Sequence, residues 1–115
     1  MDALGDGLYN NGDHLQAVRE LRKAIEINPE FGFAQVHLGM ALYARRNYED
    51  AATHLDKGLR LVGDRARIEQ FYTAGLAFIY KEPSECDKAI PWLQKALELD
   101  TESKPVIDGL TRCSQ

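Results

Sequence analysis

The chain has 115 residues, 44% of them hydrophobic, and a formal net charge of −4 at pH 7. Residues 1–63 and 64–115 each hold nine acidic and seven basic side chains, so neither half has the basic character expected of a nucleic-acid-binding protein. The length predicts one domain. No apolar run could span a membrane and no apolar signal segment follows Met1, so we expect no membrane insertion and a cytoplasmic location.

The predicted elements are short amphipathic helices. The first is expected over residues 1–11, and the second starts at residue 13 with a capping-box-like pattern and runs to about residue 27. Asn28 is expected to cap the next helix, with Pro29 at its first position, where the missing N–H does no harm.

The middle of the chain, Phe33 to Gly63, has apolar residues at three- and four-residue spacing on both sides of Arg45-Arg46-Asn47. This pattern predicts two amphipathic helices joined by a turn, with Asn47 as the cap of the second helix. Gly39 lacks a side chain where the partner helix must come close. We therefore predict a helical hairpin that packs tightly at Gly39.

The last part of the chain is expected to hold three helices, which brings the total to about seven. They are a helix over residues 65–80, a helix from Asp87 with a small kink at Pro91, and a short helix over residues 104–113. Residues 81–86 are expected to form a loose connection. A short last helix with charged residues suits the role of a cap on the apolar end of a stack.

The pattern of the middle hairpin recurs on both sides of it. Matched positions in the first two copies are 34 residues apart, and the offset to the third copy grows from 36 to 38. The matched positions are Leu4, Gly5, Leu8, Ala17, Leu21, Ala24 and Ile27; Leu38, Gly39, Leu42, Ala51, Leu55, Gly58 and Leu61; and Gly75, Phe78, Ala89, Leu93, Ala96 and Leu99. The segments KAIEINPE, KGLRLVGD and KALELDTE close the three copies.

This repetition resembles the tetratricopeptide repeat family, whose unit is a helix–turn–helix of about 34 residues. The resemblance implies an all-α fold, a right-handed α-solenoid of antiparallel helix pairs. It divides the chain into repeats at about 1–29, 30–63 and 64–101, followed by a capping helix over 104–113. The third copy has extra residues near 65–67 and 82–85, which we expect in connections between helices.

Residue types that carry catalysis or bind metals do not converge in this sequence. His14, His37 and His54 occupy different positions of the repeat, and no Cys or carboxylate completes a metal-ligand spacing around them. No glycine-rich phosphate-binding motif or nucleophile elbow is present, and the acidic pairs are typical of solvated helix faces. We therefore expect no enzyme activity, no catalytic residue, no cofactor and no bound metal.

The two cysteines, Cys86 and Cys113, lie far apart in the sequence, one near a turn and one at the tail. Two isolated cysteines are more often free thiols in a reducing compartment than members of a disulfide framework. We therefore expect both thiols to be free.

The resemblance implies that ligands bind on the concave side of the stack, which the first helix of each repeat lines. Side chains such as Tyr and Met suit peptide binding, and Asp2, Asp6 and Glu69 would place negative charge around an apolar strip. An alternative is that many of these residues, above all Met40, Leu76 and Ile79, only pack against the next repeat. The predicted partner-binding groove consists of Asp6, Tyr9, Phe33, Val36, His37, Met40, Tyr43, Glu69, Tyr72, Thr73, Leu76, Ile79 and Tyr80.

Family members that hold the acidic C-terminal tails of heat-shock chaperones use a clamp of Lys, Asn and Arg in this groove. The matching positions here are Asp2, Asp6, His37, Glu69 and Thr73, none of which is a permanent cation. The sequence therefore predicts that the carboxylate clamp is absent.

These observations favour a non-catalytic protein-interaction module that binds a protein or peptide partner. Two alternatives stay open: a self-assembling scaffold module, and a regulatory fragment of a larger protein. The first repeat lacks part of its opening turn and has no polar cap before it, so we also expect a weak homo-oligomer through the N-terminal repeat.

Overall fold

Residues 14–114 of the computed structural model are described here, and this part of the chain contains helices and turns but no strand. The helix predicted over residues 1–11 lies outside the described residues. Six α-helices follow in chain order, with one 3-10 turn: α2 (His14–Ile27), α3 (Gly32–Ala44), α4 (Tyr48–Val62), η1 (Gly63–Arg65), α5 (Ile68–Tyr80), α6 (Cys86–Leu99) and α7 (Lys104–Cys113). The prediction of an all-α helical solenoid is confirmed.

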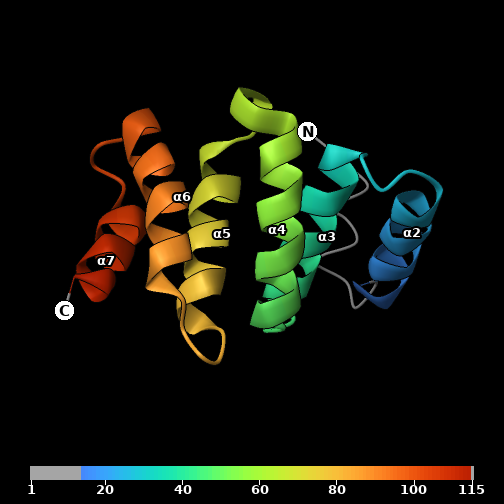
Figure 1. Cartoon of the computed structure of the whole chain (residues 1–115), viewed down its shortest axis with the longest axis horizontal. Coiled ribbons are helices and arrows are strands. Elements are labelled where there is room, and N and C mark those ends of the chain that lie inside the picture. Colours follow the sequence, from blue (N-terminus) through green and yellow to red (C-terminus); the bar gives the residue numbers. More distant parts are fainter. Residues whose placement is uncertain (1–13, 115) are drawn as a thin grey trace.

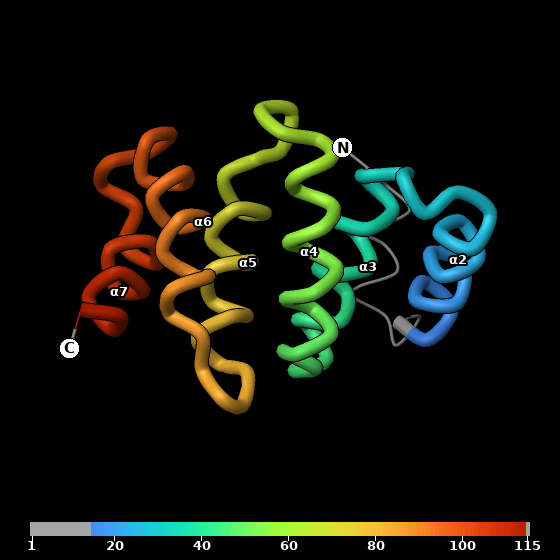
Figure 2. Tube along the Cα trace, viewed as in Figure 1, coloured from blue at the N-terminus to red at the C-terminus, as the bar shows by residue number. Residues whose placement is uncertain are grey.

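In the view of Figure 1 the helices follow one another in sequence order from α2 to α7, and α5 also contacts both α3 and α7. Consecutive helices pack on one another all along this series, and α3 with α4 and α5 with α6 form the two most intimate pairs. The trace in Figure 2 shows that α2 and α7 occupy the two ends of this series. Each helix thus reaches few others, as expected when repeats contact only their neighbours.

Glycine permits close approach at the same point of both hairpins. A Cβ on Gly39 of α3 would lie 2.5 Å from Leu55 Cγ of α4. A Cβ on Gly75 of α5 would lie 2.5 Å from Leu93 Cγ of α6. Real Cβ atoms do not approach other atoms so closely, so both positions require glycine. The close packing predicted at Gly39 is confirmed, and the second hairpin repeats it.

The connection between α2 and α3 differs from the prediction. The Asn28 side-chain oxygen accepts a hydrogen bond from the Glu30 N–H at 3.1 Å, which closes a turn around Pro29. The helix begins only at Gly32, with Phe31 as the capping residue. The prediction that Pro29 is the first helical residue is wrong, because Asn side chains readily stabilise such turns and compete with helix formation.

The helix α5 begins at Ile68, three residues later than expected. Gly63 has a φ of +59°, and residues Gly63–Arg65 form a 3-10 turn. Ala66 and Arg67 are then extended. The buried Gln70 side chain accepts a hydrogen bond from the Arg67 N–H at 3.0 Å and caps the helix start. The extra residues near 65–67 thus lie in a connection, as predicted.

The predicted helices of the last part of the chain are found close to their expected bounds. The helix α6 begins at Cys86, one residue before the expected start, and Pro91 lies in its second turn. Because proline has no N–H, the Asp87 carbonyl lacks its usual partner within the helix. A kink at Pro91 stays a prediction. The last helix, α7, has the predicted bounds of residues 104–113.

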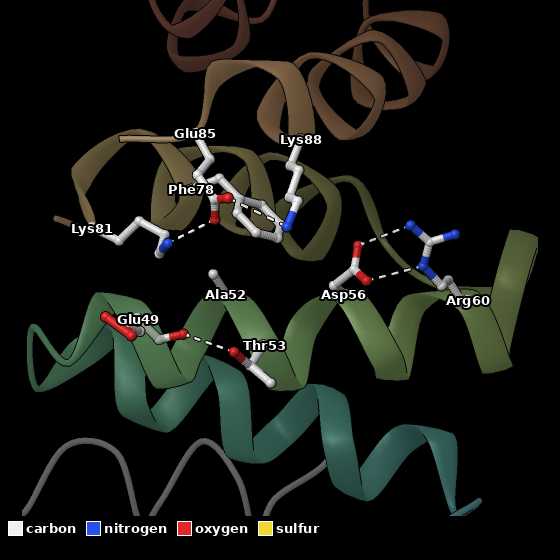
Figure 3. A pocket seen from close by; sticks show the side chains of 9 residues that line it. All are labelled: Glu49, Ala52, Thr53, Asp56, Arg60, Phe78, Lys81, Glu85 and Lys88. Atoms are coloured by element: carbon white, nitrogen blue, oxygen red, sulfur yellow. Dashed lines mark hydrogen bonds and ion pairs between the residues drawn. The ribbon is translucent and has the colours of Figure 1, made fainter. Parts of the chain in front are cut away.

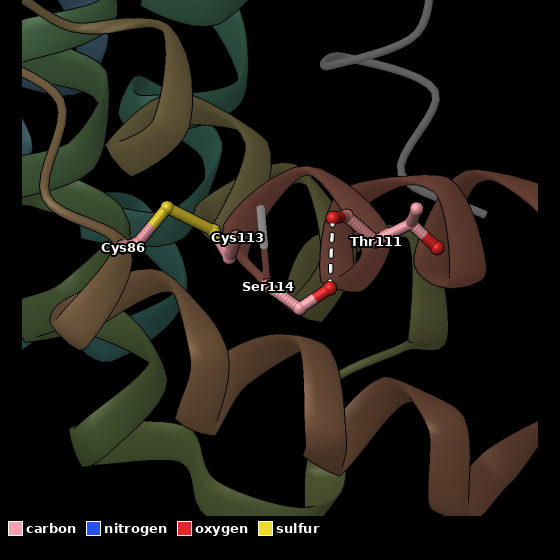
Figure 4. The surroundings of a disulfide bond; sticks show 4 residues. All are labelled: Cys86, Thr111, Cys113 and Ser114. Atoms are coloured by element: carbon pink, nitrogen blue, oxygen red, sulfur yellow. Dashed lines mark hydrogen bonds between the residues drawn. A yellow bond between two sulfur atoms is a disulfide. The ribbon is translucent and has the colours of Figure 1, made fainter.

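Cys86 and Cys113 form a disulfide, with their Cα atoms 5.5 Å apart (Figure 4). The prediction of two free thiols is therefore wrong. The two residues are 27 apart in sequence, but they are the first residue of α6 and the last residue of α7. Because α7 returns alongside α6, the start of one helix meets the end of the other. Sequence separation alone gave no sign of this.

None of the helices within residues 14–114 combines the length and the apolar character that crossing a membrane would require.

Candidate protein-binding surface

The predicted groove residues that the structure describes come from two helices that contact each other, α3 and α5. Asp2, Asp6 and Tyr9, which were predicted for the first repeat, lie outside the described residues. The remaining residues are Phe33, Val36, His37, Met40 and Tyr43 on α3, and Glu69, Tyr72, Thr73, Leu76, Ile79 and Tyr80 on α5.

Burial divides these residues into two groups. Val36 is fully buried, and Thr73 and Ile79 are also buried, so their side chains belong to the core under the surface. The others are accessible in part or exposed: Phe33, His37, Met40, Tyr43, Tyr72 and Leu76 are half-buried, and Glu69 and Tyr80 are exposed. The accessible members are mainly aromatic and apolar, which suits a surface that binds an apolar segment.

Three tyrosines lie together where α3 and α5 end. The ring of Tyr48, the first residue of α4, lies 5.3 Å from the Tyr43 ring and 5.4 Å from the Tyr80 ring. Burial raises the pKa of Tyr43 to about 12, and the neighbouring tyrosines, Tyr80 first, add to the rise. The Tyr43 hydroxyl is therefore protonated at neutral pH. Tyr48 was missed by sequence reasoning because it belongs to a second helix of the repeat.

Two arginines lie over aromatic rings of the predicted groove. The Arg65 guanidinium is 5.4 Å from the centre of the Phe33 ring, and the Arg112 guanidinium is 5.5 Å from the centre of the Tyr80 ring. Glu69, the one predicted acidic residue within the described part, pairs with Arg67 at 3.5 Å. Sequence reasoning missed both arginines, since Arg65 comes from a connection and Arg112 from the capping helix.

A separate pocket of about 420 Å³ lies between α4 and α6 (Figure 3). It is lined by Glu49, Ala52, Thr53, Asp56, Arg60, Phe78, Lys81, Glu85 and Lys88. The Glu85 carboxylate forms ion pairs with Lys81 at 2.6 Å and with Lys88 at 3.3 Å. These two lysines hold the pKa of Glu85 below its usual range. Arg60 pairs with Asp56 at 2.9 Å. The three cations that line the pocket are balanced by three carboxylates, those of Glu49, Asp56 and Glu85, so the pocket does not favour an anion.

The His54 side chain links two helices through a polar contact. His54 Nδ1 lies 2.7 Å from Gln35 Oε1, and the Gln35 amide in turn donates to the Pro29 carbonyl at 3.1 Å. This chain of contacts ties α4 to α3 and to the turn before it. Among residues 14–114, no group of three or more His, Cys, Asp or Glu side chains is arranged to hold a metal ion.

Comparison with known proteins fits this architecture. A family model described as tetratricopeptide repeat matches residues 8–74. The chain belongs to the tetratricopeptide repeat family. Members of this family are in general non-catalytic protein-interaction modules, and this is the class of function that membership supports for the chain.

Two similar proteins extend the comparison. The chain is 32% identical over 108 residues to anaphase-promoting complex subunit 3 of Dictyostelium discoideum, a match that covers 93% of the chain and 11% of that protein. The chain therefore spans only a small part of the length of this relative. The second TPR domain of human RPAP3, solved by NMR in complex with the HSP70 peptide SGPTIEEVD, has a TM-score of 0.74 at 18% identity. This likeness covers 96% of the chain and 89% of that domain, and it concerns the fold.

Proposed function

We propose that the chain binds a peptide or an amphipathic helix of a protein partner on the surface formed by α3 and α5. The observation that carries this proposal is the run of accessible aromatic and apolar side chains on two adjacent helices. It contains Phe33, Met40 and Tyr43 on α3 and Tyr72, Leu76 and Tyr80 on α5. Burying such side chains would supply most of the affinity, with the tyrosines as the strongest anchors.

The proposed groove is apolar and has predicted acidic residues at its edges. Glu69 is exposed at the start of α5, and Asp2 and Asp6 are the other predicted acidic residues. A partner segment with Lys or Arg next to its apolar anchors would suit this side. Charges at the rim of an interface mainly steer association and select the partner, and contribute less to the final affinity.

We further propose that the surface is not a clamp for the acidic tails of chaperones. Of the described positions where that clamp needs cations or amides, Thr73 is buried, His37 is half-buried and Glu69 is acidic. A ligand with two or more neighbouring carboxylates would meet no pair of permanent cations at these positions. A weak homo-oligomer through the N-terminal repeat and a role as part of a larger protein remain the alternatives.

The test is to identify a partner by affinity capture and then to measure its affinity for purified variants. Tyr43→Ala and Tyr72→Ala should each weaken binding by more than about 1 kcal/mol, because large desolvated tyrosines are typical anchors. Arg22→Ala on α2, an exposed position outside the predicted groove, is the matched control and should bind normally. Unchanged affinity for both tyrosine variants together with a loss for Arg22→Ala would show that the partner uses the outer face. Light scattering at rising concentration tests the homo-oligomer.

A further inference from the structure

The last turn of α7 places a cation at one end of the proposed groove. The Arg112 guanidinium lies over the exposed Tyr80 ring, and the next residue, Cys113, is bonded to Cys86 (Figure 4). The middle of α7 is anchored separately, since Val106 is fully buried and a Cβ on Gly109 would lie 3.0 Å from Leu93 Cδ1. Packing and the disulfide together fix the position of this turn.

The charge of Arg112 is not neutralised by any residue between 14 and 114. Other arginines of the chain form ion pairs, such as Arg60 with Asp56 and Arg67 with Glu69. Asp108 lies one turn before Arg112 on the same helix, yet the two residues form no ion pair. A guanidinium that stacks on a ring still has its in-plane N–H donors directed sideways, so it can donate to a carboxylate in fork geometry.

The surroundings of Arg112 offer further polar groups. No described residue forms a hydrogen bond with the hydroxyl of Tyr43, Tyr48 or Tyr80. The Tyr48 ring contacts the rings of both Tyr43 and Tyr80, and Arg112 lies over the Tyr80 ring. An aromatic surface whose hydroxyls and guanidinium are unpaired within residues 14–114 is complementary to a side chain that has an apolar stem and an anionic end.

One effect opposes an anion at this place. The helices α5 and α7 both end here, and the end of a helix carries about half a unit of negative charge. Arg112 carries a full unit of positive charge and reaches the anion directly, so the attraction is the larger effect. A C-terminal carboxylate is usually bound by backbone N–H donors. The C-terminal ends of helices present unpaired carbonyl groups instead of N–H donors. The geometry therefore favours a side-chain carboxylate.

We propose that Arg112, stacked on Tyr80, binds the side-chain carboxylate of a Glu or Asp in the segment that occupies the groove. This inference rests on the proposed function and adds the direction in which the partner segment lies in the groove. Glu69 and Tyr80 lie at opposite ends of α5, about 16 Å apart by the rise of 1.5 Å per residue. A partner with an acidic residue at the Arg112 end of its apolar anchors would bind in one direction only.

The disulfide is a positioning element for this subsite. A dithiol reductant converts it to two thiols by exchange: the reductant gives up two hydrogen atoms and becomes a disulfide, and Cys86 and Cys113 each gain one. The last turn of α7 then lacks its covalent link to α6, and Arg112 is held over Tyr80 by non-covalent contacts alone. Carboxylate binding should therefore weaken on reduction.

The experiment uses peptides selected from a random displayed library on the oxidised chain. A peptide whose binding is lost with Tyr43→Ala is synthesised in two forms, with its acidic residue present and with that residue changed to the amide. Both forms are titrated against the wild-type chain, Arg112→Gln, Arg112→Lys and the control Arg22→Gln. Thermal melts confirm that each variant is folded, and a further titration follows reduction.

The wild-type chain and Arg22→Gln should bind the acidic peptide about tenfold more tightly than its amide form, because a bidentate charged hydrogen bond is lost. In Arg112→Gln the affinities for the acidic peptide and its amide form should differ by less than about twofold, and in Arg112→Lys the ratio should be intermediate. Reduction of the disulfide should bring the affinity for the acidic peptide closer to that for the amide form, and the affinity for the amide form should not change.

The outcomes separate the two proposals. If no selected peptide depends on Tyr43, the proposed function fails and the subsite fails with it. If peptides depend on Tyr43 but the acidic and amide forms bind equally, or the difference survives in Arg112→Gln, the groove stands and the Arg112 subsite is wrong. If the acidic peptide binds more tightly than its amide form only when the peptide C-terminus is free, the subsite binds a terminal carboxylate. That result would overturn the assignment to a side chain.

Discussion

Trp92 on α6 donates its indole N–H to the Asp56 carboxylate on α4 at a distance of 3.0 Å, across 36 residues of sequence. Asp56 also pairs with Arg60, and the Arg60 guanidinium lies 5.8 Å from the centre of the Trp92 ring. The Trp92 ring stacks on Phe71 of α5, with 6.0 Å between the ring centres. One side chain thus joins the second helices of two consecutive repeats and covers the core between them.

The first prediction concerns this link between repeats. Trp92→Phe keeps most of the ring stacking but removes the donor, and it should lower the free energy of unfolding by about 1–2 kcal/mol. Asp56→Ala removes the acceptor for both Trp92 and Arg60. A double-mutant cycle measured by denaturant unfolding gives the coupling between Trp92 and Asp56. Additive effects of the two substitutions would show that the hydrogen bond does not contribute to stability.

The second prediction concerns the middle hairpin. Ala51 is fully buried on α4, and its carbonyl oxygen lies 3.1 Å from the position that a Cβ on Gly39 would take. Ala51→Leu should therefore overpack the hairpin and destabilise it by about 1–3 kcal/mol. Ala44→Leu, at the exposed end of α3, is the matched control and should change stability by less than about 0.5 kcal/mol. Equal melting temperatures for the two variants would mean that the position of Ala51 in the hairpin is wrong.

Local patterns were enough to predict most of the fold. The 34-residue spacing and the small residues Gly39 and Gly75 identified the helix pairs, because two helices can approach closely only where a small residue stands at the contact. The turn at Pro29 and the 3-10 turn at Gly63 were not foreseen. Both depend on competition between several local hydrogen bonds of similar energy, and sequence patterns do not resolve such a competition.

The candidate surface was harder to predict from sequence. Repeat positions placed the described groove residues on two helices that contact each other, but they did not separate Val36, which is buried, from Tyr43, which is accessible. That difference depends on the packing of each neighbouring helix. Arg112 and the disulfide at Cys113 could not be placed because α7 is joined to its neighbours by long-range contacts, and residues distant in sequence carry no local sign of pairing.

The third prediction concerns the dependence of stability on pH. Burial and, next, the nearby positive charge of Arg22 hold the pKa of His54 below its ordinary value of 6.5. As the pH falls through 6.5, the unfolded chain takes up a proton at this residue before the folded chain does, so the folded state loses stability. Unfolding curves between neutral and mildly acidic pH should show the loss. It should shrink in His54→Gln and persist in His37→Gln, and an equal loss in both variants would exclude His54 as the cause.

The fourth prediction concerns the disulfide. The Cys86–Cys113 link closes a loop of 27 residues, and links of this kind typically stabilise a small domain by about 2–4 kcal/mol. Reduction, or Cys113→Ser, should lower the unfolding free energy by that amount and increase hydrogen exchange in α7 first. Ser114→Ala, next to Cys113, serves as a control. A reduced chain as stable as the oxidised one, with α7 equally protected, would contradict the prediction.

The fifth prediction uses Tyr43 to test the tyrosine cluster. Its pKa of about 12, raised by burial and then by the neighbouring tyrosines, compares with an ordinary value of 10.0. Between these two values the unfolded chain loses the phenolic proton and the folded chain keeps it, so folding stability should fall as the pH rises through this range. Ultraviolet absorbance of tyrosinate should show one group that ionises last, and this late step should disappear in Tyr43→Phe. In Tyr72→Phe the late step should remain. If it disappears there instead, the most protected hydroxyl is that of Tyr72, and the burial of Tyr43 beside Tyr48 is not what sets the titration.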